Sequence, residues 1–116
     1  MNDIFLTVAG ALGMLIAVIH GYLGEIKVVA PITGSPTSAK RIMQAIMFLS
    51  AIYWFVGGAI LMATPYLFEG TARTFAIAFI GFLYLSGAIG NFWATRGRHI
   101  GWVLLSLTTL LIWMGA

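Results

Sequence analysis

The sequence has no cysteine and very few charged residues. None of its 116 residues is Cys, and only 8% are charged, whereas soluble domains carry about 25% charged residues. Without cysteine there is no disulfide, no thiolate catalysis, no iron–sulfur cluster and no cysteine zinc site. With 61% hydrophobic residues, a chain of this size has more apolar surface than it can bury away from water. The sequence therefore predicts that lipid surrounds much of the chain.

The few charges also exclude some partners. Six Lys and Arg residues are spread along the chain and form no basic stripe, so we expect no nucleic-acid partner. The N-terminus Met1-Asn2-Asp3 lacks the basic region of a secretory signal, and the apolar run behind it is too long for a signal core, so we expect this segment to be retained. The expected partners are the lipid bilayer and, beyond it, a second copy or another membrane protein.

Four apolar runs account for most of the chain. They cover residues 4–24, 42–64, 75–93 and 100–116, and the first would form a helix about 31 Å long, enough to cross the hydrocarbon core. Lipid satisfies no backbone polar group, so spanning segments in such a chain are helices. Because the connections are short, we expect a single all-α domain over residues 1–116: an integral membrane, antiparallel four-helix bundle of up-down-up-down topology.

The basic residues predict how this bundle is oriented. Loops 25–41 and 95–99 hold five of the six Lys and Arg residues, and loop 65–74 holds only Arg73. Cytoplasmic loops carry an excess of Lys and Arg. We therefore expect those two loops in the cytoplasm, and both termini on the outer, periplasmic side of a bacterial inner membrane.

Two ionisable residues end the first run. His20 and Glu25 follow a stripe of small residues at helical spacing, which lets another helix come close. We therefore expect both side chains to lean toward a neighbouring helix. Gln44, Asn91 and His99 lie toward the same end of the other runs. Polar groups at membrane depth are costly and are functional candidates by default, so His20, Glu25 and Asn91 are candidates for a ligand or proton site.

Aromatic residues near the middle of the second and third runs complete the candidate set. Tyr and Trp normally gather at membrane interfaces, but Tyr53, Trp54 and Tyr84 lie near mid-depth. We expect these three side chains to face the bundle interior. Ser50 and Ser106 are interpreted as ordinary helix hydroxyls.

Packing is the competing interpretation of the same residues. His20 and Asn91 would then hydrogen-bond neighbouring helices, and Glu25 would pair at the interface with Lys27, Lys40 or Arg41. No nucleophile, base and orienting group come together, so we expect no enzyme and no catalytic residue. We also expect no metal site. A haem between His20 and His99 is an alternative that needs both imidazoles on facing helices, and His99 lies in a short turn.

The end of the first run resembles that of a known group. The stretch His20-Gly21-Tyr22-Leu23-Gly24-Glu25, followed by Lys27 and Pro31, is similar to a set of small uncharacterised bacterial four-span inner-membrane proteins with a His-x3-Gly-Glu element after the first span. That resemblance implies no activity. Small multidrug transporters also have four spans, but their essential Glu lies in the middle of the first helix, and their aromatic signature does not match.

The leading prediction is a non-enzymatic accessory or ligand-binding membrane protein with a polar site at the cytoplasmic end of the bundle. A first alternative is a small proton-coupled transporter of hydrophobic or cationic compounds, with Glu25 or His20 as proton acceptor. Such a carrier needs that group to be reachable from each side in turn. A second alternative is a haem- or quinone-associated subunit of a redox complex.

Overall fold

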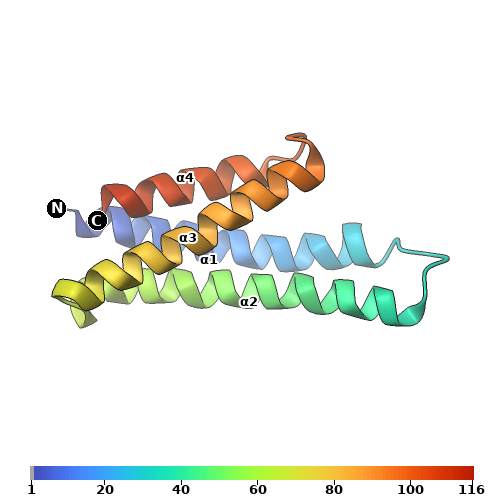
Figure 1. Ribbon diagram of the computed structural model, residues 1–116, viewed down its shortest axis with the longest axis horizontal. Coiled ribbons are helices and arrows are strands. Elements are labelled where there is room, and N and C mark those ends of the chain that lie inside the picture. Colours follow the sequence, from blue (N-terminus) through green and yellow to red (C-terminus); the bar gives the residue numbers. More distant parts are fainter. Residues whose placement is uncertain (1) are drawn as a thin grey trace.

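The computed structural model describes residues 2–116 as four helices packed in a bundle, which confirms the all-α four-helix prediction. Helix α1 covers Asp3–Leu23, α2 Thr37–Leu67, α3 Gly70–Thr95 and α4 Gly101–Met114. Successive helices run in opposite directions, so both ends of the chain lie at the same end of the bundle (Figure 1). We call this the terminal end; the opposite end, with residues 30–36 and 96–100, is the loop end.

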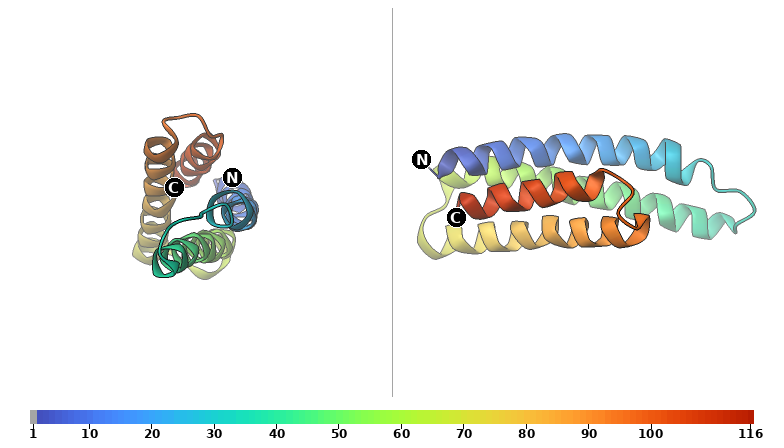
Figure 2. Two further views of the ribbon diagram at one scale, coloured as in Figure 1. Left: turned by 90° about the vertical axis from the view of Figure 1, so that its right-hand side faces the viewer. Right: turned by 90° about the horizontal axis from the view of Figure 1, so that it is seen from above.

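Each helix packs against two others around the bundle. Helix α1 contacts α2 and α4, while α3 contacts α4 and α2, and the molecule is elongated, measuring 51 × 25 × 19 Å (Figure 2). Helices α1 and α2 approach most closely where Gly10 faces Gly58. A Cβ on Gly58 would lie only 2.6 Å from the Gly10 carbonyl oxygen, and a Cβ on Gly10 would collide with the Gly58 carbonyl. This crossing therefore depends on two residues without side chains.

Helix α1 does not stop at the expected end of the first run. It continues as a π-helix, η1, over Gly24–Val29, in which the Ala30 amide donates to the Glu25 carbonyl at 2.8 Å. The wider π turn is a single-turn feature that often accompanies functional positions. The expected loop over 25–41 is consequently reduced to residues 30–36, and Glu25 lies on helical backbone.

Helix α2 is longer than the apolar run that predicted it. It begins at Thr37 and runs through Pro65 to Leu67, beyond both ends of the apolar run 42–64. Proline removes one intrahelical hydrogen bond. Here that loss falls in the last turn, where the Thr64 hydroxyl donates to the Ile60 carbonyl at 2.7 Å and the Phe68 amide donates to the Thr64 carbonyl at 3.1 Å.

Three helical segments, Asp3–Val29, Thr37–Leu67 and Gly70–Thr95, are long and apolar enough to cross a membrane. The fourth, Gly101–Met114, is apolar but has only 14 residues, which corresponds to about 21 Å against about 30 Å of hydrocarbon. Because α4 is short, the α1–α2 hairpin extends beyond the α3–α4 turn at the loop end (Figures 1 and 2). The two basic loops therefore lie at different levels.

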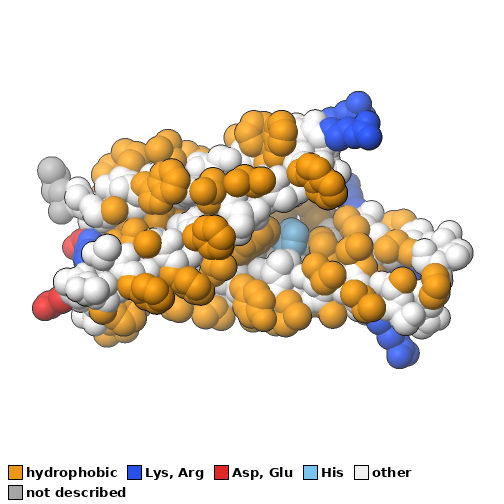
Figure 3. All heavy atoms as spheres, in the orientation of Figure 1, with side chains coloured by type: hydrophobic (Ala, Val, Ile, Leu, Met, Phe, Trp, Pro, Cys, Tyr) orange, Lys and Arg blue, Asp and Glu red, His pale blue; other side chains and the backbone are white. Residues whose placement is uncertain are grey.

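The surface of the bundle is apolar between its two ends. Figure 3 shows hydrophobic side chains over most of the visible face, with basic side chains at the loop end and acidic ones at the terminal end. Large side chains such as Ile19, Phe82 and Ile89 are exposed along the helices. This is the surface expected of helices that face lipid.

Candidate functional site

His20 is held against α2 by a hydrogen bond to Ser50. Its Nε2 lies 2.9 Å from the Ser50 Oγ, and the Ser50 hydroxyl donates to the Met47 carbonyl at 3.0 Å. A hydroxyl has one proton to donate. While the hydroxyl donates to Met47, Ser50 accepts from His20, an arrangement that favours the tautomer with its proton on Nε2. The expectation that His20 leans toward a neighbouring helix is therefore met through Ser50.

Two aromatic side chains continue from His20 into the bundle centre. The His20 and Trp54 rings are 4.6 Å apart, and the Trp54 and Tyr84 rings are stacked at 6.4 Å. The Tyr84 side chain is fully buried and donates its hydroxyl to the Trp54 carbonyl at 2.5 Å. The three rings thus form a continuous aromatic column across α1, α2 and α3.

Glycines provide the space for this column. A Cβ on Gly13 would collide with the Tyr84 hydroxyl, and a Cβ on Gly87 would collide with the Trp54 ring. Gly13, a member of the predicted small-residue stripe of α1, therefore accommodates a tyrosine of α3, whereas Gly10, outside that stripe, meets the backbone of α2. The expectation that mid-depth aromatics face inward is correct for Trp54 and Tyr84. It is wrong for Tyr53, which is 57% exposed, because the next residue along a helix points about 100° away.

Glu25 is bonded to an amide and not to a cation. The Gln44 Nε2 donates to both carboxylate oxygens of Glu25, at 3.0 and 3.1 Å. Lys40, one of the expected partners, instead donates to the carbonyls of Ala30 and Ile32, at 3.4 and 3.5 Å. In the described residues the only ion pair is Arg73 with Asp3 at the terminal end. Glu25 and His20 thus belong to two separate pairs along the same α1–α2 seam.

Asn91 and His99 come together at the α3–α4 turn. A Cβ on Gly101 would lie 2.8 Å from the His99 Nδ1 and 3.2 Å from the Asn91 Nδ2, so both side chains flank the same glycine. The His99 Nδ1 accepts from the Gly101 amide at 3.0 Å. The structure therefore brings Asn91 and His99 together at this turn, while His20 is held against α2 by Ser50.

The turn that carries His99 is well supported. It leaves α3 through Arg96 and Gly97, both with positive φ, and the Gly97 amide donates to the Phe92 carbonyl at 2.9 Å. The Trp102 indole donates to the Gly97 carbonyl at 3.0 Å and packs edge-on against Phe92 at 5.1 Å. These contacts close the end of α3 and set the position of His99 relative to Asn91.

Asn91 has unused hydrogen-bonding capacity. Its Oδ1 is buried, and within residues 2–116 it is the buried side-chain oxygen or nitrogen that finds no partner. A buried polar atom without a partner costs free energy. By contrast, the buried Thr108 and Thr109 donate to carbonyls of their own helix, both at 2.9 Å. Asn91 Oδ1 is therefore the unpaired buried acceptor among the described residues.

The structure identifies the partners of the candidate residues. Ser50 and Gln44 are the partners of the two ionisable residues, and Gly101 lies between Asn91 and His99. The sequence predicted Gln44 toward the same end of the bundle as Glu25, but it predicted no role for Ser50 beyond that of an ordinary helix hydroxyl. A serine four residues before a buried tryptophan on one helix face was the available signal.

The described residues contain no group of three or more His, Cys, Asp and Glu side chains that could hold a metal ion. No protein-family model matches the chain, and no curated protein or solved structure is significantly similar to it. The chemistry of the site therefore follows from its own geometry: a buried acceptor without a partner on α3 and an aromatic column within an apolar bundle.

Proposed function

We propose that the protein is a multi-pass membrane protein of the inner membrane, with both termini on the outer side, and that it binds a small ligand between α1, α2 and α3 without catalysing a reaction. One observation carries the ligand site. Asn91 Oδ1, toward the loop end of α3, is a buried acceptor without a partner, and His20 on α1 is a second polar group toward that end. An apolar pocket with a few convergent polar groups is the usual form of a ligand site.

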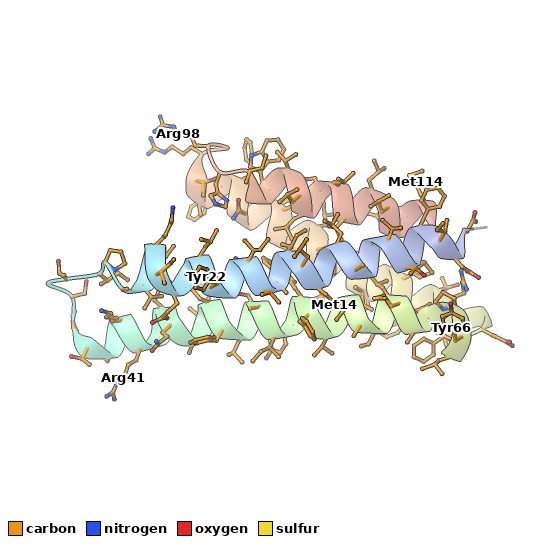
Figure 4. All side chains as sticks on the ribbon, turned by 180° about the vertical axis from the view of Figure 1, so that it is seen from behind. Met14, Tyr22, Arg41, Tyr66, Arg98 and Met114 are labelled. Carbon is orange, nitrogen blue, oxygen red and sulfur yellow. The ribbon has the colours of Figure 1, made fainter. Side chains whose placement is uncertain are left out.

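The distribution of charge supports the orientation. Arg41 and Arg98 lie at the loop end of the bundle, while Tyr66 and Met114 lie at the terminal end (Figure 4). With the loop end in the cytoplasm, the basic residues satisfy the positive-inside rule. Helix α2 is about 46 Å long, so its first turns extend beyond about 30 Å of hydrocarbon. The Glu25–Gln44 pair then lies near the cytoplasmic surface, and the His20–Ser50 pair lies deeper.

Single-cysteine labelling tests the orientation directly, because the chain has no cysteine of its own. Ser35→Cys places a thiol in the α1–α2 loop, and Glu69→Cys places one between α2 and α3. In intact spheroplasts an impermeant maleimide is expected to label Glu69→Cys at once, and Ser35→Cys only after permeabilisation. Ile89→Cys, on the exposed face of α3, is the control that lipid protects from both sides. Labelling of both loops from one side would overturn the proposal.

The ligand site is tested by NMR of the protein in nanodiscs. The imidazole nitrogens of His20 and the side-chain amide of Asn91 are monitored while a panel of lipid-soluble alcohols, amines, quinones and quinols is added. A ligand of this site is expected to shift both sets of signals and to leave the Asn2 side-chain amide, at the terminal end, unchanged. If every compound that binds leaves His20 and Asn91 unmoved, the polar contacts are packing contacts alone.

A further inference from the structure

The α3–α4 turn carries two cations that no carboxylate neutralises. Arg96 and Arg98 are exposed, and neither takes part in an ion pair within the described residues. From Gly70 to the end of the sequence there is no Asp or Glu, and Glu25, the acidic residue toward the loop end, is bonded to Gln44. The two charges of the turn are therefore available to an anionic partner from outside the bundle.

Arg96 occupies a backbone position that normally takes glycine. It directly follows α3 and lies in the left-handed region, with φ 52° and ψ 38°, where many helices end on glycine. Within residues 2–116 it is the only residue other than glycine with positive φ. A side chain on this backbone is strained, and such positions concentrate in segments that bind ligands. An arginine here therefore indicates that its guanidinium group has a use outside the helix.

The turn offers side chains, and not backbone amides, to an anion. The amides of residues 96–98 all donate to carbonyls at the end of α3, at distances between 2.9 and 3.4 Å. The Gly101 amide donates to His99 Nδ1 at 3.0 Å, so the proton of the neutral imidazole is on Nε2. The donors that remain are two guanidinium groups and His99 Nε2. Guanidinium groups bind phosphate through paired hydrogen bonds, which favours a phosphate as the anion.

The short α4 holds this turn at the level of the lipid headgroups. Its 14 residues span about 21 Å against about 30 Å of hydrocarbon. When the other end of α4 lies at the opposite surface, the turn cannot extend far into water. Trp93, in the last turn of α3, is 81% exposed, and Ile100, directly before α4, is 62% exposed. An exposed tryptophan at a helix end is typical of a membrane interface.

We propose that the α3–α4 turn is a docking surface for anionic phospholipid. Arg96 and Arg98 pair with the lipid phosphate, His99 Nε2 donates to a phosphate oxygen, and Trp93 contacts the acyl chains. Lipids with net negative charge are selected, because the phosphate of a zwitterionic lipid already has its own cation beside it. This inference rests on the proposed membrane location and goes beyond the proposed ligand site, which involves none of these four side chains.

The test is a titration of phosphatidylglycerol into phosphatidylcholine nanodiscs that hold the protein, followed by the side-chain ¹⁵N signals of arginine and histidine. We expect Arg96, Arg98 and His99 to shift and to saturate as phosphatidylglycerol increases. Arg98→Asn should weaken the apparent affinity about fivefold. Arg41→Asn removes the same charge from α2, where Arg41 and Arg98 point away from each other on opposite sides of the loop end (Figure 4), and should weaken it less than about twofold.

Arg96→Gly separates binding from folding. Glycine suits a φ of 52°, so the unfolding temperature should stay the same or rise while the affinity for phosphatidylglycerol falls about fivefold. A lower unfolding temperature with unchanged affinity would overturn the proposal, because Arg96 would then only stabilise the end of α3.

Two further outcomes would overturn the proposal. Equal losses in Arg98→Asn and Arg41→Asn would show that total charge alone sets the affinity. Equal shifts with soluble glycerol phosphate would show that the turn binds phosphate without lipid. The labelling of Ser35→Cys and Glu69→Cys reports on membrane orientation independently, since phosphatidylglycerol is present in both leaflets of the nanodisc.

Discussion

The Ser50 hydroxyl lies 2.9 Å from the His20 Nε2 and donates to the Met47 carbonyl at 3.0 Å. A hydroxyl has one proton, so while it donates to Met47 the serine accepts from the histidine, which favours the tautomer with its proton on Nε2. The contact also holds the imidazole of an otherwise apolar helix against α2.

The first prediction concerns this pair. Ser50→Ala should remove the acceptor of His20 Nε2, so that the ¹⁵N spectrum changes from one tautomer to a mixture, and the free energy of unfolding should fall by about 0.6–1.7 kcal/mol. Ser86→Ala is the control, because the exposed Ser86 makes the same type of bond to the carbonyl three residues earlier, at 2.9 Å. An unchanged tautomer in Ser50→Ala would contradict the assignment.

A second prediction concerns the space for Tyr84. Gly13→Ala would place a methyl group against the Tyr84 hydroxyl, and overpacking of this kind typically costs about 1–3 kcal/mol. Gly90→Ala meets no atom within 4 Å, so it should be neutral or stabilise the helix by up to about 1 kcal/mol. Unfolding in mixed detergent measures both. Equal effects of the two changes would show that the Gly13–Tyr84 approach does not constrain the bundle.

Tyr84→Phe tests the hydrogen bond that crosses the centre. The change removes the donor to the Trp54 carbonyl and keeps the ring, so the free energy of unfolding should fall by about 1 kcal/mol. Tyr66→Phe is the matched control, since the Tyr66 side chain is 82% exposed. A loss as large in Tyr66→Phe would indicate that the effect does not arise from the buried bond.

Gln44→Leu tests how Glu25 is stabilised. Leucine keeps the volume of the side chain but removes both hydrogen bonds to the carboxylate. Hydrogen bonds to a charged group contribute about 1.5–3 kcal/mol, and because this pair is only partly buried, we expect a loss near the lower value. Met43→Leu, at the neighbouring exposed position, should change stability by less than about 0.5 kcal/mol. If Gln44→Leu also changes the free energy of unfolding by less than about 0.5 kcal/mol, water replaces Gln44 as the partner of Glu25.

The Asp3–Arg73 pair closes the terminal end. Arg73 Nη2 lies 2.6 Å from the Asp3 carboxylate and 3.4 Å from the Gly115 carbonyl, joining α1, α3 and the end of α4. Because the Asp3 side chain is 53% exposed, Asp3→Asn should cost less than about 1 kcal/mol, and the loss should disappear at 1 M salt. Glu69→Gln, which also removes an acidic charge at this end, is the control. A salt-independent loss in Asp3→Asn would point to packing and not to charge.

The sequence predicted the helices better than their ends. Apolar runs between polar segments were enough to find all four helices and the alternation of their direction. The predicted end of the first helix at residue 24 was wrong, because η1 continues the helix through Glu25 and Lys27. Two charged residues so close together are typical of a loop. The end of α2 lies beyond residue 64, because the single hydrogen bond that Pro65 removes does not stop the helix in its last turn.

The candidate site was predicted by type of residue and not by partner. His20, Glu25, Asn91, Trp54 and Tyr84 were selected because polar and aromatic groups are costly or unusual at mid-depth, and the structure places His20, Trp54 and Tyr84 in one column. It separates Glu25 from His20 and turns Tyr53 outward. The pairing of Ser50 with His20 and of Gln44 with Glu25 follows only from the packing of α1 on α2. A helix pattern shows which face is polar but not which residue lies opposite.

The sequence by itself determined that the chain is all-α, that lipid suits its surface, and that its polar residues gather toward one end, because these properties follow from composition and from the order of apolar and polar segments. Only the tertiary structure decided which atoms are paired. The Ser50–His20 hydrogen bond, the unpaired Asn91 oxygen and the stacking of Trp54 on Tyr84 all depend on the rotation and crossing of helices, which is set by close contacts such as Gly10 on Gly58.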